Sequence, residues 1–196
     1  MRCGILAFQG DVAEHEQALA RLGVKAQRIT QTQELVEITH LIIPGGESTV
    51  IGAFLKESGM GALIQERVRS KTLAVFGTCA GAIVLANHVE SLKPVESLQL
   101  IDTTISRNAY GSQINSFEDT ITFEPSKEAI NAVFIRAPKI TGVGEGVTIL
   151  AEHNGMPVLV RTQNILVSTF HPEYLDAPII HRYFLGIDKG DTLLIH

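Results

Sequence analysis

The fold is decided by residues 72–86, which read TLAVFGTCAGAIVLA. The apolar run at 72–76 predicts a buried strand, and residues 82–86 predict a helix. Only the small residues of the Gly77-Thr78-Cys79-Ala80-Gly81 turn separate the two elements. A strand that passes directly into a helix is typical of a parallel sheet covered by helices.

The segments before this stretch repeat the alternation. Short apolar runs predict strands, and apolar residues at helical spacing predict helices. The predicted elements are strand 3–8, helix 12–22, strand 24–29, strand 40–43, helix 48–57 and helix 60–69. This order again favours a sheet with helices on both faces.

The second half is dominated by closely spaced strand candidates punctuated by Gly, Pro and Asn. They are residues 98–106, 119–123, 132–136, 147–151, 158–162 and 165–170. We expect some of them to form an antiparallel extension and others to return to the main sheet, with 176–185 as a closing helix. No repeat, low-complexity segment or linker interrupts the chain, so we expect a single domain over residues 1–196.

Composition excludes several classes of protein. The chain has 196 residues, of which 45% are hydrophobic and 19% charged, as in globular proteins. Its net charge of −5 and its lack of a Lys/Arg cluster argue against a nucleic-acid partner. No segment approaches the roughly 18 apolar residues of a membrane span, and we expect no signal peptide, because residues 1–5 show no long apolar run or cleavage site. Two cysteines form no disulfide framework, so we expect a reducing, cytoplasmic setting.

Cys79 is the candidate nucleophile. The G-x-C-x-G pattern between a strand and a helix has the form of a nucleophile elbow with cysteine in place of serine. Gly77 and Gly81 permit the sharp turn, which lifts the sulfur to the carboxyl end of the sheet, where open α/β folds bind ligands. The helix N–H groups favour a thiolate. The alternative is that Cys79 is a small buried core residue.

His171 and Glu173 are the candidate base and its orienting carboxylate. His171 follows the apolar run 165–170, so we expect it at the end of a strand, and Pro172 stiffens the turn after it. In an extended segment, residues i and i+2 point the same way, so Glu173 would accept a hydrogen bond from His171. The alternatives are a turn histidine and a solvated acid.

The other histidines have weaker contexts. His15 lies on a charged helix, for which a solvated face is the expected environment. No histidine pair has the spacing of metal ligands, so we expect neither a metal ion nor another cofactor.

The loop Pro44-Gly45-Gly46-Glu47-Ser48 follows the third predicted strand. Its glycines let backbone N–H groups approach a ligand closely. The N–H groups of Gly46 and Ala80 are therefore the candidate oxyanion hole for acyl transfer. The alternative is an ordinary turn in which Ser48 caps the next helix.

These motifs together resemble the triad glutamine amidotransferases. The superfamily motifs are Pro44-Gly45-Gly46-Glu47-Ser48-Thr49, Phe76-Gly77-Thr78-Cys79-Ala80-Gly81 and Phe170-His171-Pro172-Glu173. More narrowly, four further stretches resemble the glutaminase subunits of pyridoxal 5'-phosphate synthases. They are Leu6-Ala7-Phe8-Gln9-Gly10-Asp11-Val12 with Glu14-His15, Ser106-Arg107-Asn108-Ala109-Tyr110-Gly111, Phe134-Ile135-Arg136-Ala137-Pro138 and Glu152-His153-Asn154-Gly155.

The resemblance implies a flavodoxin-like α/β fold of class I glutamine amidotransferases, with a mostly parallel central sheet, flanking helices and a small antiparallel extension. It implies that Cys79 attacks the side-chain amide of L-glutamine, that His171 moves the proton and that Glu173 orients His171. Ammonia would pass to a synthase subunit that builds pyridoxal 5'-phosphate, in a hetero-oligomer. By position, the glutamine-binding residues would be Gly46, Glu47, Ser48, Arg107, Ile135 and Arg136.

Two other interpretations stay open from the sequence. A cysteine hydrolase or stress protein of the related elbow-cysteine superfamily shares the elbow, but it does not need the His171-Pro172-Glu173 turn. It also leaves Glu47, Arg107 and Arg136 unexplained. A non-catalytic regulatory subunit would retain only a vestigial site. The intact Cys79, His171 and Glu173 argue against that second alternative.

Overall fold

The computed structural model describes residues 1–107 and 116–187. Residues 108–111 of the Arg-Asn-Ala-Tyr-Gly motif and the C-terminal segment 188–196 lie outside the described residues.

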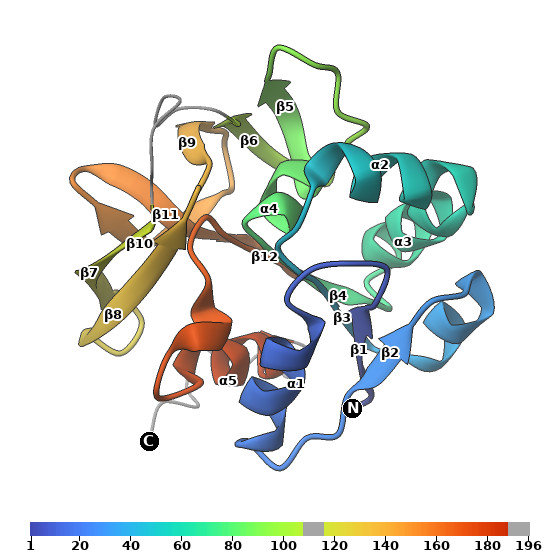
Figure 1. The fold of residues 1–196 in the computed structure, drawn as a ribbon, viewed down its shortest axis with the longest axis horizontal. Helices are drawn as coiled ribbons and strands as arrows, with labels where there is room; N and C mark the ends of the chain where they lie inside the picture. Colours follow the sequence, from blue (N-terminus) through green and yellow to red (C-terminus); the bar gives the residue numbers. More distant parts are fainter. Residues whose placement is uncertain (108–115, 188–196) are drawn as a thin grey trace.

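A seven-stranded sheet forms the centre of the described structure (Figure 1). In spatial order its strands are β10 (Thr148–His153), β11 (Met156–Thr162), β12 (Ile165–Ser168), β4 (Ala74–Thr78), β3 (His40–Ile43), β1 (Cys3–Leu6) and β2 (Gln27–Ile29). Neighbours from β12 to β2 are parallel, whereas β10, β11 and β12 pair antiparallel. The expected parallel sheet with an antiparallel extension is confirmed.

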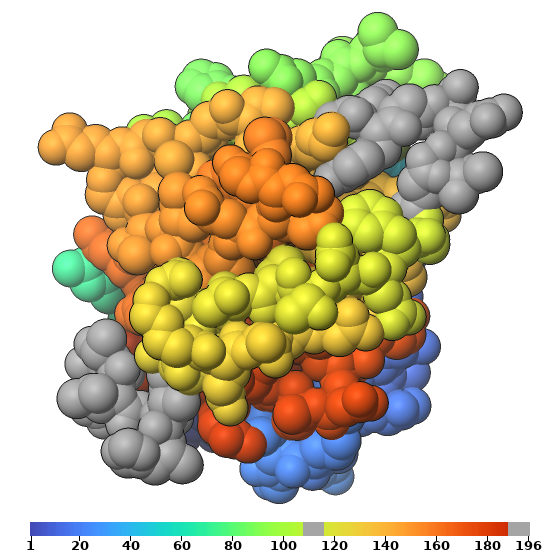
Figure 2. Space-filling view, turned by 90° about the vertical axis from the view of Figure 1, so that its left-hand side faces the viewer, coloured from blue at the N-terminus to red at the C-terminus, as the bar shows by residue number. Residues whose placement is uncertain are grey.

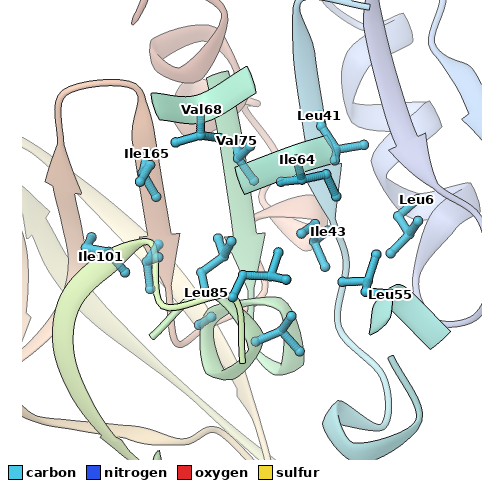
Figure 3. Packing of buried hydrophobic residues seen from close by; sticks show 14 of the residues in the cluster. Leu6, Leu41, Ile43, Leu55, Ile64, Val68, Val75, Leu85, Ile101 and Ile165 are labelled. Atoms are coloured by element: carbon cyan, nitrogen blue, oxygen red, sulfur yellow. The ribbon is translucent and has the colours of Figure 1, made fainter. Parts of the chain in front are cut away.

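Helices cover both faces of this sheet. On one face lie α2 (Ser48–Glu57), α3 (Met60–Arg69) and α4 (Ala80–Leu85), and on the other lie α1 (Val12–Ala20) and α5 (Ile179–Leu185). The alternation of side chains along β3 divides the core accordingly. Leu41 and Ile43 pack with α2 to α4, as Figure 3 shows, whereas Ile42 packs with α1 and α5.

The remaining strands form two small sheets. One contains β5 (Ala86–Glu90), β6 (Ile101–Ser106) and β9 (Lys139–Val143), and the other is the hairpin of β7 (Ser116–Phe123) and β8 (Glu128–Ile135). Figure 2 shows this hairpin, in yellow, beside the red segment that contains the short 3-10 helix η2 (Pro172–Tyr174) and α5. A second 3-10 helix, η1 (Thr32–Glu37), precedes β3. In the described ranges, no helix has both the length and the apolar character that a membrane crossing needs.

Most of the predicted bounds differ from the structure by a few residues, and the sequence did not predict strands β5 and β9. Two of the differences concern helices. The helix after the elbow ends at Leu85 and the chain continues at once as β5, where the sequence predicted helix to residue 86. The closing helix begins at Ile179 rather than at residue 176, because Pro178 disfavours helical backbone at the residue before it. By contrast, the predicted bounds of β3, α2 and α3 are confirmed.

The register of the parallel strands brings four loops together. Ser168 of β12 pairs with Thr78 of β4, and Ile43 of β3 pairs with Gly77. The loops that follow β12, β4, β3 and β1 therefore leave the same edge of the sheet. This edge carries the candidate site.

Candidate active site

Cys79 stands in a strained turn between β4 and α4. Its backbone has φ 49° and ψ −101°, a combination that residues with a Cβ rarely adopt. The Cys79 N–H donates to the Ser168 carbonyl at 2.9 Å, which ties the turn to β12. The Sγ atom lies 3.9 Å from the Ile135 carbonyl oxygen, at the end of β8. The turn thus holds the thiol above the edge of the sheet.

Two glycines make this turn possible. A Cβ on Gly81 would lie 2.0 Å from the Ile43 carbonyl oxygen, and a Cβ on Gly77 would lie 2.6 Å from the Gly81 carbonyl. Both contacts involve backbone atoms, which cannot rotate away as a side chain can. The steric role that the sequence predicted for these glycines is confirmed.

His171 reaches the same edge of the sheet from β12. The backbone N–H of His171 donates to the Val133 carbonyl at 2.8 Å, and the ring atom Nδ1 lies 2.7 Å from Glu173 Oε1. The predicted i to i+2 contact is present, but its expected cause was wrong. The strand ends at Ser168, and a 3-10 turn that begins at Pro172 brings Glu173 back toward His171.

The imidazole is held in an anionic environment. Asp11 Oδ2 lies 3.3 Å from His171 Nδ1, on the same side as Glu173. Burial opposes the charged imidazolium, but the contacts with Asp11, the Cys79 thiol and Glu173 outweigh it and raise the pKa of His171. Burial also raises the pKa of Glu173, whereas its hydrogen bond to His171 opposes that shift. Because Nδ1 is occupied, Nε2, which has no well-formed hydrogen bond, is the nitrogen left for the thiol and for substrate.

A cavity of about 450 Å³ opens over the thiol. Its lining includes all of the residues that the sequence assigned to the site except Glu173, which is buried behind His171. Those lining residues are Gly46, Glu47, Ser48, Cys79, Ala80, Arg107, Ile135, Arg136 and His171. The volume falls in the range of small-molecule sites.

Charged side chains of both signs line the cavity. Arg107 and Glu47 form an ion pair, and Arg136 adds a second cation from a backbone with φ 45°. Glu47, rather than Ser48, caps α2, because its side chain accepts hydrogen bonds from Thr49. Ser48 Oγ is buried without a hydrogen-bond partner. A ligand with polar groups of both signs would satisfy these side chains.

Two further residues of the site, not assigned from the sequence, lie at the N-cap of α1 and within that helix. Asp11 contacts His171, and His15, expected on a solvated face, is fully buried and lies 3.5 Å from Glu173. A signal was available for His15. It shares the i, i+3, i+4 spacing of the buried Ala18 and Leu19, which marks the inner face of the helix.

Asp11, His171 and Glu173 also form a group that offers three metal-ligand atoms within 4.8 Å of one another. However, His171 Nδ1 lies 2.7 Å from Glu173 and 3.3 Å from Asp11. The 2.7 Å separation suits a hydrogen bond and is shorter than the roughly 3.4 Å between two ligand atoms that each lie about 2.0–2.2 Å from one tetrahedral zinc ion. We therefore assign the group as a hydrogen-bonded cluster.

Comparison with known proteins gives consistent matches over nearly the whole chain. A sequence model of the SNO glutamine amidotransferase family matches residues 5–187. The pyridoxal 5'-phosphate synthase subunit PdxT of Thermus thermophilus is 45% identical over 184 residues, which cover 94% of this chain and 96% of that protein. The subunit of the same name from Thermotoga neapolitana is 46% identical over 190 residues, covering 96% of this chain and 100% of that protein.

The fold gives the same result. A crystal structure described as that of a glutamine amidotransferase matches with a TM-score of 0.92 at 42% identity, and the match covers 96% of this chain and 100% of that one. The fold class expected from the sequence is confirmed.

Proposed function

The chain belongs to the SNO glutamine amidotransferase family, and on that premise we propose that it hydrolyses L-glutamine to L-glutamate and ammonia with Cys79, His171 and Glu173. The observation that carries the proposal is the common cavity. Cys79 and His171 line it together, and Glu173 holds the far nitrogen of His171 at 2.7 Å. A nucleophile, a base and an orienting carboxylate are what acyl transfer through a thioester requires.

The reaction follows from these positions. The Cys79 sulfur attacks the side-chain carbonyl carbon of glutamine, and the oxygen gains negative charge. The N–H groups of Gly46 and Ala80 are the proposed donors to that oxygen. His171, which holds the proton taken from the thiol, gives it to the leaving nitrogen, and ammonia departs. His171 then takes a proton from water, which attacks the thioester and releases glutamate.

In the proposed complex, the charged side chains that line the cavity bind the substrate. In our proposal Arg107 binds the α-carboxylate of glutamine, because a guanidinium forms charge-assisted bonds to carboxylates. Glu47 balances the α-ammonium, and Ser48 Oγ, buried without a partner, supplies a further polar contact. Ile135 and Arg136 complete the wall beside Cys79. The Arg107–Glu47 ion pair supports this assignment, because glutamine would replace each partner with a group of the same charge.

Ammonia would be passed to a second protein. Because the matched relatives carry the name of a pyridoxal 5'-phosphate synthase subunit, we propose that this chain acts in a hetero-oligomer with a synthase subunit. The proposed chemistry needs no cofactor on the glutaminase, which we assign as one domain spanning the chain. Both cysteines are free, in keeping with a reducing cytoplasm.

The test measures ammonia release from glutamine, with and without the synthase subunit, for wild type, Cys79→Ala and Cys3→Ala. Cys3 is buried in β1 and serves as the matched control. We expect release that increases with the synthase subunit, disappears in Cys79→Ala and persists in Cys3→Ala. Wild-type-like release by Cys79→Ala would refute the nucleophile. No release by wild type beside an active synthase would favour the hydrolase or the regulatory subunit.

A further inference from the structure

Two buried histidines lie behind the triad, on the side away from the cavity. His15 of α1 and His181 of α5 are both fully buried, and His15 Nδ1 lies 2.8 Å from His181 Nε2. His15 Nε2 lies 3.5 Å from Glu173 Oε2 and 3.3 Å from Thr78 Oγ1. The reaction described above uses neither histidine. Their line nevertheless ends on the carboxylate that orients His171.

The carboxylate has one oxygen in need of a donor. Oε1 of Glu173 faces His171, whereas Oε2 is buried without a well-formed hydrogen bond. A buried carboxylate oxygen without a donor is costly when the group is ionised. His15 Nε2 lies 3.5 Å from this oxygen, and the backbone N–H of Glu173 also interacts with the same carboxylate.

The proton positions follow from burial. Burial holds the pKa of His15 well below its usual range, and repulsion from the charged forms of His181 and His171 lowers it further. Burial also lowers the pKa of His181 to about 3. Both rings are therefore neutral at neutral pH, and each carries one N–H. If His15 carries its proton on Nε2, that N–H points toward both Thr78 Oγ1 and Glu173 Oε2, and Nδ1 accepts from His181 Nε2–H. The opposite tautomer would aim a lone pair of His15 at Glu173.

We infer that His15 is a positioning residue of the triad, whose Nε2–H holds the second oxygen of Glu173 while His181 fixes the tautomer of His15. This inference rests on the proposed function. It extends the line Cys79–His171–Glu173 by two histidines that never touch substrate. Glu173 held at both oxygens keeps its Oε1 directed at His171 through both proton transfers.

Arg21, just after helix α1, holds the backbone of the segment that follows Glu173. Its guanidinium donates to the carbonyl oxygens of Leu175 at 2.9 Å and Asp176 at 2.8 Å. Among the described residues, the charged and titratable groups that face Glu173 are His171 and Tyr174 from its own turn, and Asp11, His15 and Arg21 from α1 and its two ends. Of these, His15 is the group against Oε2.

The test compares His15→Leu with His15→Gln in the presence of the synthase subunit. The Gln side chain can place an amide N–H near the position of the imidazole Nε2, whereas Leu fills the space without a donor. We expect His15→Leu to lower kcat about ten- to hundredfold at an unchanged KM for glutamine, the loss expected for a hydrogen bond to a charged group. His15→Gln should recover most of the loss. His88→Leu, at an exposed histidine of β5, is the control.

A second readout follows the alkylation of Cys79 by iodoacetamide against pH, without turnover. Loss of the donor makes Glu173 easier to protonate, which weakens the imidazolium of His171 and the thiolate it stabilises. The acid limb of alkylation should therefore move to higher pH in His15→Leu and stay in place in His15→Gln. Equal loss of kcat in both variants without that movement, or wild-type behaviour of His15→Leu, would refute the inference. Failure of wild type to release ammonia would instead refute the proposed function, and alkylation would still test the line of histidines.

Discussion

The backbone strain at Cys79 can be measured by comparing the stabilities of two variants at this position. With φ 49° and ψ −101°, its Cβ collides with neighbouring backbone atoms, whereas glycine adopts the mirror-image regions freely. We therefore expect Cys79→Gly to be more stable than Cys79→Ala, although glycine usually destabilises. Both variants lack the sulfur, so the comparison isolates the effect of the Cβ.

The magnitude follows from two opposing terms. A residue forced into such a backbone conformation costs about 1–3 kcal/mol. Glycine loses about 0.5–1 kcal/mol more than alanine in chain entropy on folding. The two ranges differ by about 0–2.5 kcal/mol, with a centre at about 1 kcal/mol, and by this amount the free energy of unfolding of Cys79→Gly should exceed that of Cys79→Ala. For a chain of this size, about 1 kcal/mol corresponds to about 2–4 °C in Tm.

The assay is urea unfolding of the two variants, followed by circular dichroism, with Tm as a second measure. Ala62 lies exposed in the first turn of α3, on helical backbone, and provides the control. There Ala→Gly should lower stability by up to about 1 kcal/mol. The two positions should thus give effects of opposite sign. A Cys79→Gly variant less stable than Cys79→Ala would show that the elbow is not strained.

Three further predictions use other contacts. Gly81→Ala should unfold at a clearly lower temperature than wild type or fail to accumulate, because its Cβ would lie 2.0 Å from the Ile43 carbonyl oxygen. The control Gly142→Ala, whose Cβ would lie 3.5 Å from Thr104, should change Tm little. Equal changes of Tm in the two variants would contradict this prediction. Arg107→Ala should raise KM for glutamine about tenfold or more, with a smaller effect on kcat. The control Arg28→Ala, which breaks the exposed ion pair with Glu16, should leave KM unchanged. An unchanged KM in Arg107→Ala would show that Arg107 does not bind substrate. The free energy of unfolding should fall as pH drops from 6.5 toward 3. In this range the unfolded chain binds protons at His15 and His181, whereas the folded protein does not, because both pKa values are lowered in it. Each histidine contributes up to about 1.4 kcal/mol per pH unit. The raised pKa of Glu173 has the opposite effect on the pH dependence of stability, in wild type and in variants alike. The test therefore compares how steeply the free energy of unfolding falls with pH in His181→Gln and in wild type. We expect a shallower fall in His181→Gln, and equal slopes would refute the prediction.

The sequence by itself determined much of the local structure. The bounds of β3, α2 and α3 follow from short-range patterns, and so does the elbow, because a glycine on either side of Cys79 lets the chain turn within a few residues. The pairing of His171 with Glu173 was also predictable, since the two residues are neighbours in one turn. These features depend on residues close together in the chain, where backbone propensity and sterics act.

The tertiary structure decided which of these local features meet. Cys79 and His171 share a cavity because β12 pairs with β4, Ser168 opposite Thr78, and nothing in either motif specifies that pairing. The burial of His15 against Glu173 and the contact of Asp11 with His171 depend on how α1 packs under the turn after β12. A charged helix with a histidine predicts a solvated face until the packing surface is known. Partners distant in the chain are chosen by the register of the sheet and the packing of helices on it, and these minimise the free energy of the whole core rather than of one segment.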